Sequence, residues 1–224
     1  MLNENDNEFL KSVFDFYKNL NENEKKLISS NTNKNAYEKG KLITNNEDEC
    51  NGIVIVKSGQ LRAYIISEDG KEITLYRLLS SDVCIMTASC VLKNITFNVQ
   101  LEIEKESVLY IMPSSVWSIL SNSNALVKEY ALELISSRFS EVMWVMEQVV
   151  FMGMGQRLSA FLLEQSTLEQ SSSITITHDT ISKNLGTARE VISRLLKYFE
   201  NEGLIELSRG TIKLINNKKL RSMS

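Results

Sequence analysis

The stretch from Asn124 to Phe151 constrains the fold more than any other part of this sequence, because it contains neither glycine nor proline. Apolar residues recur along it in steps of three and four, which predicts one long helix with an apolar seam. The seam consists of Val127, Ala131, Leu134, Val142, Val145 and Val149. Such a helix needs a partner along its length. We interpret the seam as a symmetric dimer interface, and the alternative is packing on the helix's own domain.

The residues before this helix show strand periodicity instead. Short β-branched runs between residues 37 and 111 are separated by glycines, which predicts an antiparallel sandwich or barrel. The runs are Ile53–Val56, Leu61–Ile66, Ile73–Leu79, Phe97–Ile103 and Val108–Ile111. The segment Glu68–Lys71 fits a hairpin turn, because Gly70 supplies a positive φ angle. Residues 8–30 have helical spacing and predict short helices that cap the sheet.

Pro113, the only proline, follows the last predicted strand and precedes two serines where a helix can start. At 224 residues the chain is long enough for two domains. We therefore predict an α+β chain with an antiparallel β-domain at 1–122, a long helix at 123–152 and a second domain at 153–224.

Composition narrows the class of protein. No apolar run approaches the ~20 residues that cross a bilayer, and the first seven residues are polar and acidic, so we expect a cytoplasmic protein that does not bind membranes. The three cysteines show no CxxC spacing and suggest neither a disulfide framework nor zinc. We find no catalytic fingerprint such as GxSxG or HExxH, and a single histidine offers few general bases. We expect no enzyme activity and no cofactor.

Charge is distributed unevenly along the chain. Residues 151–224 hold 10 Lys and Arg against 7 Asp and Glu, which leaves +3. Residues 1–150 hold 15 against 21, which leaves −6. The basic character therefore lies at the C-terminal end, where binding of nucleic-acid phosphates would need it.

The segment from Ile174 to Leu214 predicts a strand, a helix, a turn, a helix and a hairpin. Thr177 can cap the first helix, Gly186 can supply the turn, and Thr187 with Glu190 forms a capping box for the second helix. This order is typical of a winged helix-turn-helix.

The second of these helices has two faces. Ile192, Leu195, Leu196 and Phe199 have the spacing of a buried face, and the outward side carries Arg189, Glu190, Ser193 and Arg194. Arginine can bond guanine and a carboxylate can accept from cytosine, so we predict that these four side chains contact bases. The alternative is a merely solvated face. Thr187, Lys197, Arg209 and Lys213 are the predicted contacts to DNA phosphates.

Two motifs resemble a known family. TAREVISRLLKYFENEGLI resembles the recognition helix of Crp/Fnr transcription regulators, and IVKSGQLRAYIISEDGKEITLYRL resembles their cyclic-nucleotide-binding-type β-roll, with Gly59 and Gly70 at its turns. Arg189, Glu190 and Arg194 match the family's base-contacting pattern. The resemblance implies that 1–122 is a sensory β-roll domain, 123–152 a dimerisation helix and 153–224 a winged-helix DNA-binding domain. It also implies a homodimer on a palindromic operator with TGTGA-like or TTGAT-like half-sites. The resemblance also suggests RNA polymerase as a partner.

The sensory domain does not match the cyclic-AMP pattern. Ile85-Met86 stands near the expected Gly-Glu turn and Ile95-Thr96 near the expected Arg-Ser pair, so a nucleotide phosphate would lack a guanidinium partner. Three cysteines are too few for a four-thiolate cluster, and His178, outside the β-domain, disfavours haem. His178 is better read as a cap or a neighbour of a phosphate.

We therefore expect an unidentified small effector. Met86, Phe97 and Trp144 are candidates to line its apolar pocket, although such residues are more often plain core. Cys84 and Cys90 are read as small buried hydrophobes, with redox-sensing thiols as the alternative. Two other functions stay open: a regulator without any ligand, and a β-roll module that binds a protein rather than DNA.

Overall fold

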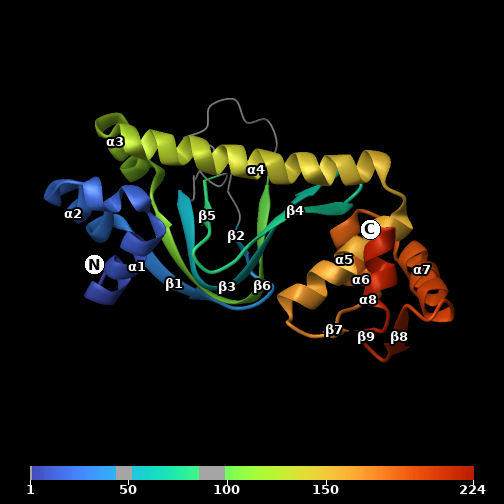
Figure 1. Cartoon of the computed structure of the whole chain (residues 1–224). Coiled ribbons are helices and arrows are strands. Elements are labelled where there is room, and N and C mark those ends of the chain that lie inside the picture. Colours follow the sequence, from blue (N-terminus) through green and yellow to red (C-terminus); the bar gives the residue numbers. More distant parts are fainter. Residues whose placement is uncertain (1, 44–51, 86–98) are drawn as a thin grey trace. The chain divides into compact units, whose positions relative to one another are not determined.

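The computed structural model describes residues 2–43, 52–85 and 99–224. The chain divides into two compact units, one comprising Met1–Ile65 and Leu75–Val142 and the other Ile66–Thr74 and Met143–Ser224 (Figure 1). None of the helices in the described ranges combines the length and the hydropathy that spanning a membrane requires. The domain boundaries after residues 122 and 152 stay predictions.

Short helices precede and follow the strands of the first unit. They are α1 (Glu4–Val13), the 3-10 helix η1 (Asp15–Asn19), α2 (Glu22–Asn31) and α3 (Ser114–Ser123). Asn3 and Asn21 cap α1 and α2, because each side chain accepts a bond from the amide three residues on. The backbone amide of each asparagine donates in return to the carboxylate of that residue, Asp6 or Glu24. These capping boxes fix both starts, and α1 begins four residues before the predicted helical segment.

Six strands form one sheet in the order β1-β6-β3-β4, with β2 also paired to β6 and β5 to β3 (Figure 1). Their bounds are β1 (Asn33–Tyr37), β2 (Leu42–Ile43), β3 (Ile53–Ile66), β4 (Glu72–Leu78), β5 (Val83–Cys84) and β6 (Gln100–Met112). The partners of β6, namely β1, β2 and β3, are antiparallel to it. This is the antiparallel β-domain that the glycine-separated runs predict.

Gly59 does not lie at a turn, and this part of the prediction is wrong. Ile53–Val56 and Leu61–Ile66 belong to one strand, β3, whose pairing with β6 shifts register around Gly59. Gly59 has φ +98°, and a Cβ there would come within 2.6 Å of the Ser107 Cα. The glycine therefore permits a β-bulge and a close approach of two strands. Gly70 does occupy the predicted turn, with φ +74° and an amide that donates to the Ser67 carbonyl.

An aspartate is buried between the N-terminal helix and the sheet of the first unit. Asp6 on α1 is 3% exposed, and its carboxylate accepts bonds from Lys34 (2.6 Å), Lys57 (3.1 Å) and the Tyr110 hydroxyl (2.7 Å). Burial disfavours ionisation of Asp6, but the bonds from Lys34, Tyr110 and Lys57 outweigh it and hold the pKa far below its usual value. We call these four residues the Asp6 cluster.

The second unit has its own core and its own sheet. Its elements after the long helix are α5 (Met154–Leu168), β7 (Ser173–Thr175), α6 (His178–Leu185), α7 (Arg189–Asn201), β8 (Ile205–Ser208), β9 (Thr211–Leu214) and α8 (Asn217–Met223). The three strands pair in the order β7-β9-β8. Leu158, Ile181, Ile192, Leu196 and Phe199 belong to one buried cluster that joins α5, α6 and α7. This is the predicted helix-turn-helix with its wing.

Candidate DNA interface

The first helix of the motif, α6, begins and ends as the sequence predicts. The Thr177 hydroxyl accepts a bond from the Thr180 amide at 3.0 Å, so Thr177 is the N-cap and His178 is the first helical residue. Gly186 ends the helix in the left-handed region at φ +66°. The interpretation of His178 as a cap is wrong, because the N-cap of α6 is the neighbouring Thr177.

The start of α7 differs from the prediction. Its N-cap is Ala188, with extended backbone angles and no side-chain capping bond, so the expected Thr187–Glu190 capping box does not form. Thr187 lies one residue too early, and its amide instead bonds the Ser182 carbonyl as part of the turn. Glu190 remains exposed in the first turn, where the helix dipole favours its negative charge.

The two faces of α7 separate as its periodicity predicts. Ile192, Leu196 and Phe199 are fully buried, while Arg189, Glu190 and Arg194 are exposed. Within the described part of the chain, no ion pair joins these three side chains to another group. We call them the recognition strip. Its groups can donate to or accept from a base edge without first breaking an ion pair.

Two other predicted contacts on α7 are partly engaged within the chain. The Lys197 ammonium lies 2.7 Å from a Glu200 carboxylate oxygen, and Lys197 is exposed. Ser193 is half-buried, and its hydroxyl donates to the Arg189 carbonyl at 3.0 Å. That hydroxyl also lies 2.9 Å from Nδ1 of His178. The partner pair of His178 and Ser193 was not foreseen, because 15 residues separate them in the sequence.

The wing consists of β8 and β9, joined at Arg209 and Gly210. Gly210 has φ +75°, and Arg209 is exposed beside it at the tip of the hairpin. Lys213 is exposed and lies 3.9 Å from Glu206 on the opposite strand. Glu200 joins the wing to α7, because it accepts a bond from the Leu207 amide at 3.1 Å. The bonds from Lys197 and from that amide lower the pKa of Glu200.

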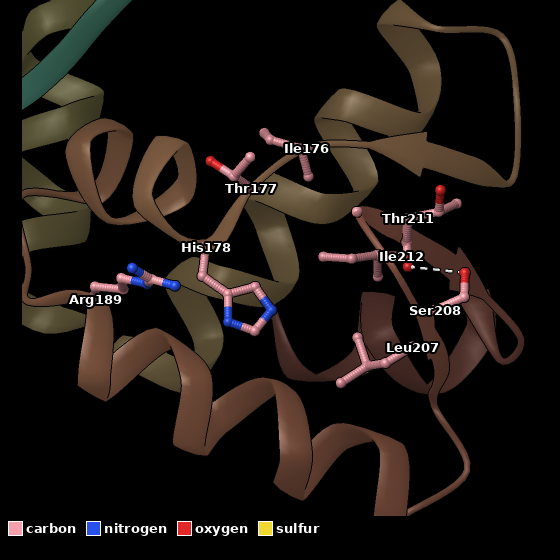
Figure 2. Close-up of a pocket in the computed structure, with 9 residues that line it drawn as sticks. Ile176, Thr177, His178, Arg189, Leu207, Ser208, Thr211 and Ile212 are labelled. Carbon is pink, nitrogen blue, oxygen red and sulfur yellow. Dashed lines mark hydrogen bonds between the residues drawn. The ribbon is translucent and has the colours of Figure 1, made fainter.

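A groove of about 240 Å³ lies between the wing and the starts of α6 and α7 (Figure 2). His178 stands at its centre, with Arg189 on one side and Ser208 and Thr211 of the wing on the other. Among the described residues that line the groove, none is acidic. The groove therefore suits an anionic group.

The long helix α4 runs from Ala125 to Phe151, close to the predicted bounds. The predicted dimer seam is only partly accessible, and this needs correction. Val127 is fully buried in the core of the first unit. Ala131, Leu134 and Val142 are partly buried and pack against the apolar clusters of that unit. Val145 is also half-buried, and Val149 is exposed. The burial of Val127 therefore excludes that residue from the predicted seam, and the rest of the seam stays a prediction.

A different apolar face of α4 is open. Leu132, Phe139, Met143, Met146 and Val150 are each between 43% and 65% exposed. With Ser136 they are spaced in alternating steps of four and three, the spacing of a coiled-coil seam. We call these five apolar residues the outer stripe.

One apolar cluster lies inside the β-domain. Val54, Leu61, Ala63, Leu101 and Ile103 are fully buried in one cluster with Cys84. Met86 and Phe97 of the predicted effector pocket lie outside the described residues, as does Cys90. Trp144 is more than half exposed. The effector pocket thus stays a prediction.

Buried arginines of the first unit already have carboxylate partners. Arg62 lies 3.2 Å from Glu102, and Arg77 lies 2.8 Å from Glu104. Arg138, on α4, lies 2.8 Å from Glu141, and its guanidinium covers the ring of Tyr76 at 4.8 Å. Arg138, which interrupts the predicted seam, is therefore held by its own domain.

Comparisons with known proteins agree with this geometry. A Crp-like helix-turn-helix domain matches residues 156–223, and a cyclic nucleotide-binding domain matches residues 34–124. A solved structure from Eubacterium rectale, described as a Crp/Fnr-family transcriptional regulator, is 43% identical with a TM-score of 0.91 and covers 95% of this chain and 98% of its own.

Two curated relatives are more distant. The regulatory protein HlyX of Actinobacillus pleuropneumoniae is 28% identical over 180 residues, which are 77% of this chain and 73% of HlyX. The fumarate and nitrate reduction regulatory protein of Vibrio cholerae is 25% identical over 202 residues, which are 85% of this chain and 78% of that protein.

The fold, the interface and these matches define a DNA-binding transcription regulator with a winged helix and a cyclic-nucleotide-binding-type β-domain. The chain belongs to the Crp/Fnr family.

Proposed function

We propose that this regulator binds a palindromic operator as a homodimer and that a small effector other than cyclic AMP controls it. The observation that carries the proposal is the recognition strip. Arg189, Glu190 and Arg194 are exposed on one side of a helix whose other side is fully buried. Exposed guanidinium and carboxylate groups near a helix N-terminus can form the paired bonds that distinguish base edges in the major groove.

Contacts to phosphates would set affinity rather than sequence preference. Arg209 at the wing tip and Lys213 on β9 are the exposed cations that we assign to this role, with Thr187 and Lys197 as further contacts. Ser193 stays a proposed base contact, although its hydroxyl proton already serves the Arg189 carbonyl.

The outer stripe supports a homodimer. Five large apolar side chains at coiled-coil spacing can pack against the same stripe of a second copy, and a two-fold axis makes such a surface self-complementary. A dimer would present two recognition helices to half-sites about one helical turn apart, and hence a palindrome.

The exclusion of cyclic AMP is supported by the charges of the first unit. A buried phosphate needs a cation, but the buried arginines in the described part of this unit, Arg62, Arg77 and Arg138, are each already paired with a carboxylate. We expect isothermal titration calorimetry of cyclic AMP to give no saturable heat. Tight binding would contradict the exclusion.

Selection from random duplex DNA tests the operator. The full chain should enrich a palindrome, with and without a metabolite extract that supplies candidate effectors. Replacing Arg189, Glu190 and Arg194 by alanine should abolish the preference for the enriched duplex over random duplex. The matched control is Lys218→Ala with Arg221→Ala on α8, which also removes two exposed cations and should preserve the preference.

Sedimentation equilibrium tests the dimer. Phe139→Glu combined with Met146→Glu should convert the dimer to a monomer, because each copy would place charges in the apolar seam. Ser137→Glu adds a charge to an exposed position of the same helix outside the stripe and should leave the dimer intact. A dimer that persists in the double variant would contradict the assignment of the interface.

A further inference from the structure

His178 and Ser193 form a hydrogen bond that engages one nitrogen of the imidazole. The Ser193 hydroxyl donates its single proton to the Arg189 carbonyl at 3.0 Å. The same hydroxyl lies 2.9 Å from Nδ1 of His178, so this contact engages Nδ1 whichever of the two atoms is the donor. Nε2 is therefore the ring nitrogen that is left to bond another group.

The surroundings of His178 are suited to an anion. The imidazole stands in the groove between Arg189 and the wing, and Thr177, Ser208 and Thr211 line the same groove (Figure 2). Its α7 neighbours are Ser193 and Arg189, and the wing contributes the uncharged residues Leu207, Ser208, Thr211 and Ile212. On its own helix Asp179 follows directly, and this exposed carboxylate lies 3.7 Å from Lys183.

We propose that this groove binds one phosphate of the DNA backbone and that His178 donates to that phosphate from protonated Nε2. The proposal rests on the function proposed above and names a contact within it. The imidazolium carries a donor on each ring nitrogen and a positive charge, whereas the neutral ring has one donor and no charge. A bound phosphate compensates the charge of the imidazolium. Protonation and DNA binding therefore favour each other.

We expect a pH dependence of DNA affinity near neutral pH to come from His178, because it is the only histidine of the chain. An ordinary imidazole changes charge between about pH 5 and pH 8. A charge-assisted bond that exists only on the acid side should raise affinity about tenfold between about pH 8 and pH 6. Contact to phosphate carries no sequence information, so random duplex should show the same rise as the operator.

Fluorescence anisotropy of the full chain with operator and random duplexes, at fixed salt across this pH range, tests the proposal. His178→Gln should bind both duplexes with a nearly flat profile close to the native affinity at high pH. His178→Arg should bind tightly at all pH values, because guanidinium keeps its charge. Ser193→Ala frees the imidazole to rotate and should reduce the tenfold rise. Thermal unfolding of each variant controls for folding.

The outcomes separate this contact from the proposed function. A chain that prefers no selected sequence contradicts the operator assignment, while its binding to random duplex still tests His178. Native protein with equal affinity at both ends of the range, or a His178→Gln profile like the native one, overturns only the phosphate contact. Inorganic phosphate alone should cause no saturable shift of the His178 ring resonances by NMR. A saturable shift would reassign the groove to a free anion.

Discussion

The Asp6 cluster and the recognition strip are two groups of charged side chains with opposite surroundings. Asp6 is almost wholly buried and accepts bonds from Lys34, Lys57 and Tyr110. The recognition strip is exposed, and no ion pair engages it within the described part of the chain. A buried charge must be compensated inside the fold, whereas an exposed one keeps its hydration and its freedom to bond a ligand.

The comparison predicts that charge removal has separable effects in the two places. In the Asp6 cluster it should affect the free energy of unfolding and leave DNA affinity unchanged. On the recognition strip it should affect DNA affinity and leave unfolding unchanged. Each of the following experiments therefore measures both quantities on the full chain.

The largest expected effect is that of Asp6→Asn. The substitution keeps the shape but leaves Lys34 and Lys57 near a neutral partner, and breaking a buried ion pair costs about 3 kcal/mol of stability. Both lysines are about one-third exposed and can turn toward water. The expected loss is therefore at the lower end of the roughly 3–5 kcal/mol that breaking a buried ion pair costs. Urea unfolding measures it. Glu8→Gln on the same helix removes an exposed carboxylate, paired with Lys11 at 3.3 Å, and should cost less than about 0.5 kcal/mol.

The same cluster predicts a pH dependence. Because the pKa of Asp6 is lowered in the folded protein, its stabilisation is fully present above the ordinary aspartate pKa of about 3.9 and is lost as pH falls through the lower, folded value. The stability difference between native protein and Asp6→Asn should therefore be constant at neutral pH and shrink below about pH 4. A difference that stays constant into strong acid would show that the charge of Asp6 is not what stabilises the fold.

The recognition strip should respond in the opposite way. Arg194→Ala should weaken operator binding by about 2 kcal/mol and relax the preference at one base pair, with unfolding changed by less than about 0.5 kcal/mol. Arg189→Ala should act similarly at another base pair. Competition assays with operators carrying single substitutions locate the affected position. A uniform loss over all duplexes would instead class the arginine as a phosphate contact.

The sequence predicts the elements whose signals are local. The long helix follows from a stretch without glycine or proline, and the buried face of α7 follows from the spacing of Ile192, Leu196 and Phe199. The bulge at Gly59 could not be told from a turn, because both need a positive φ. The predicted N-cap of α7 was one residue too early, because Ala188, and not Thr187, adopts the extended backbone of the N-cap.

Contacts between distant residues were not predictable. The partners of Asp6 lie 28, 51 and 104 residues away, so no periodicity connects them. The burial of Val127, at the start of the predicted dimer seam, was missed for a different reason. α4 is apolar on two faces, and spacing alone could not say which face, Val127 or Phe139, meets the chain's own core.

The smallest expected effects come from the proposed phosphate contacts, and they divide the exposed cations further. Arg209→Ala should lower affinity for operator and random duplexes alike and reduce the slope of log K against log salt by about 0.9, the value for one lost phosphate contact. Lys197→Ala should change the slope less, because the Lys197 ammonium already lies 2.7 Å from Glu200 and would have to leave it to reach DNA. Lys213, at 3.9 Å from Glu206, should fall between the two. An equal change of slope in Lys197→Ala and Arg209→Ala would contradict this order: pairing within the chain would then not predict which exposed cations are available to DNA. The contrast between compensated and uncompensated charges would hold only for buried groups.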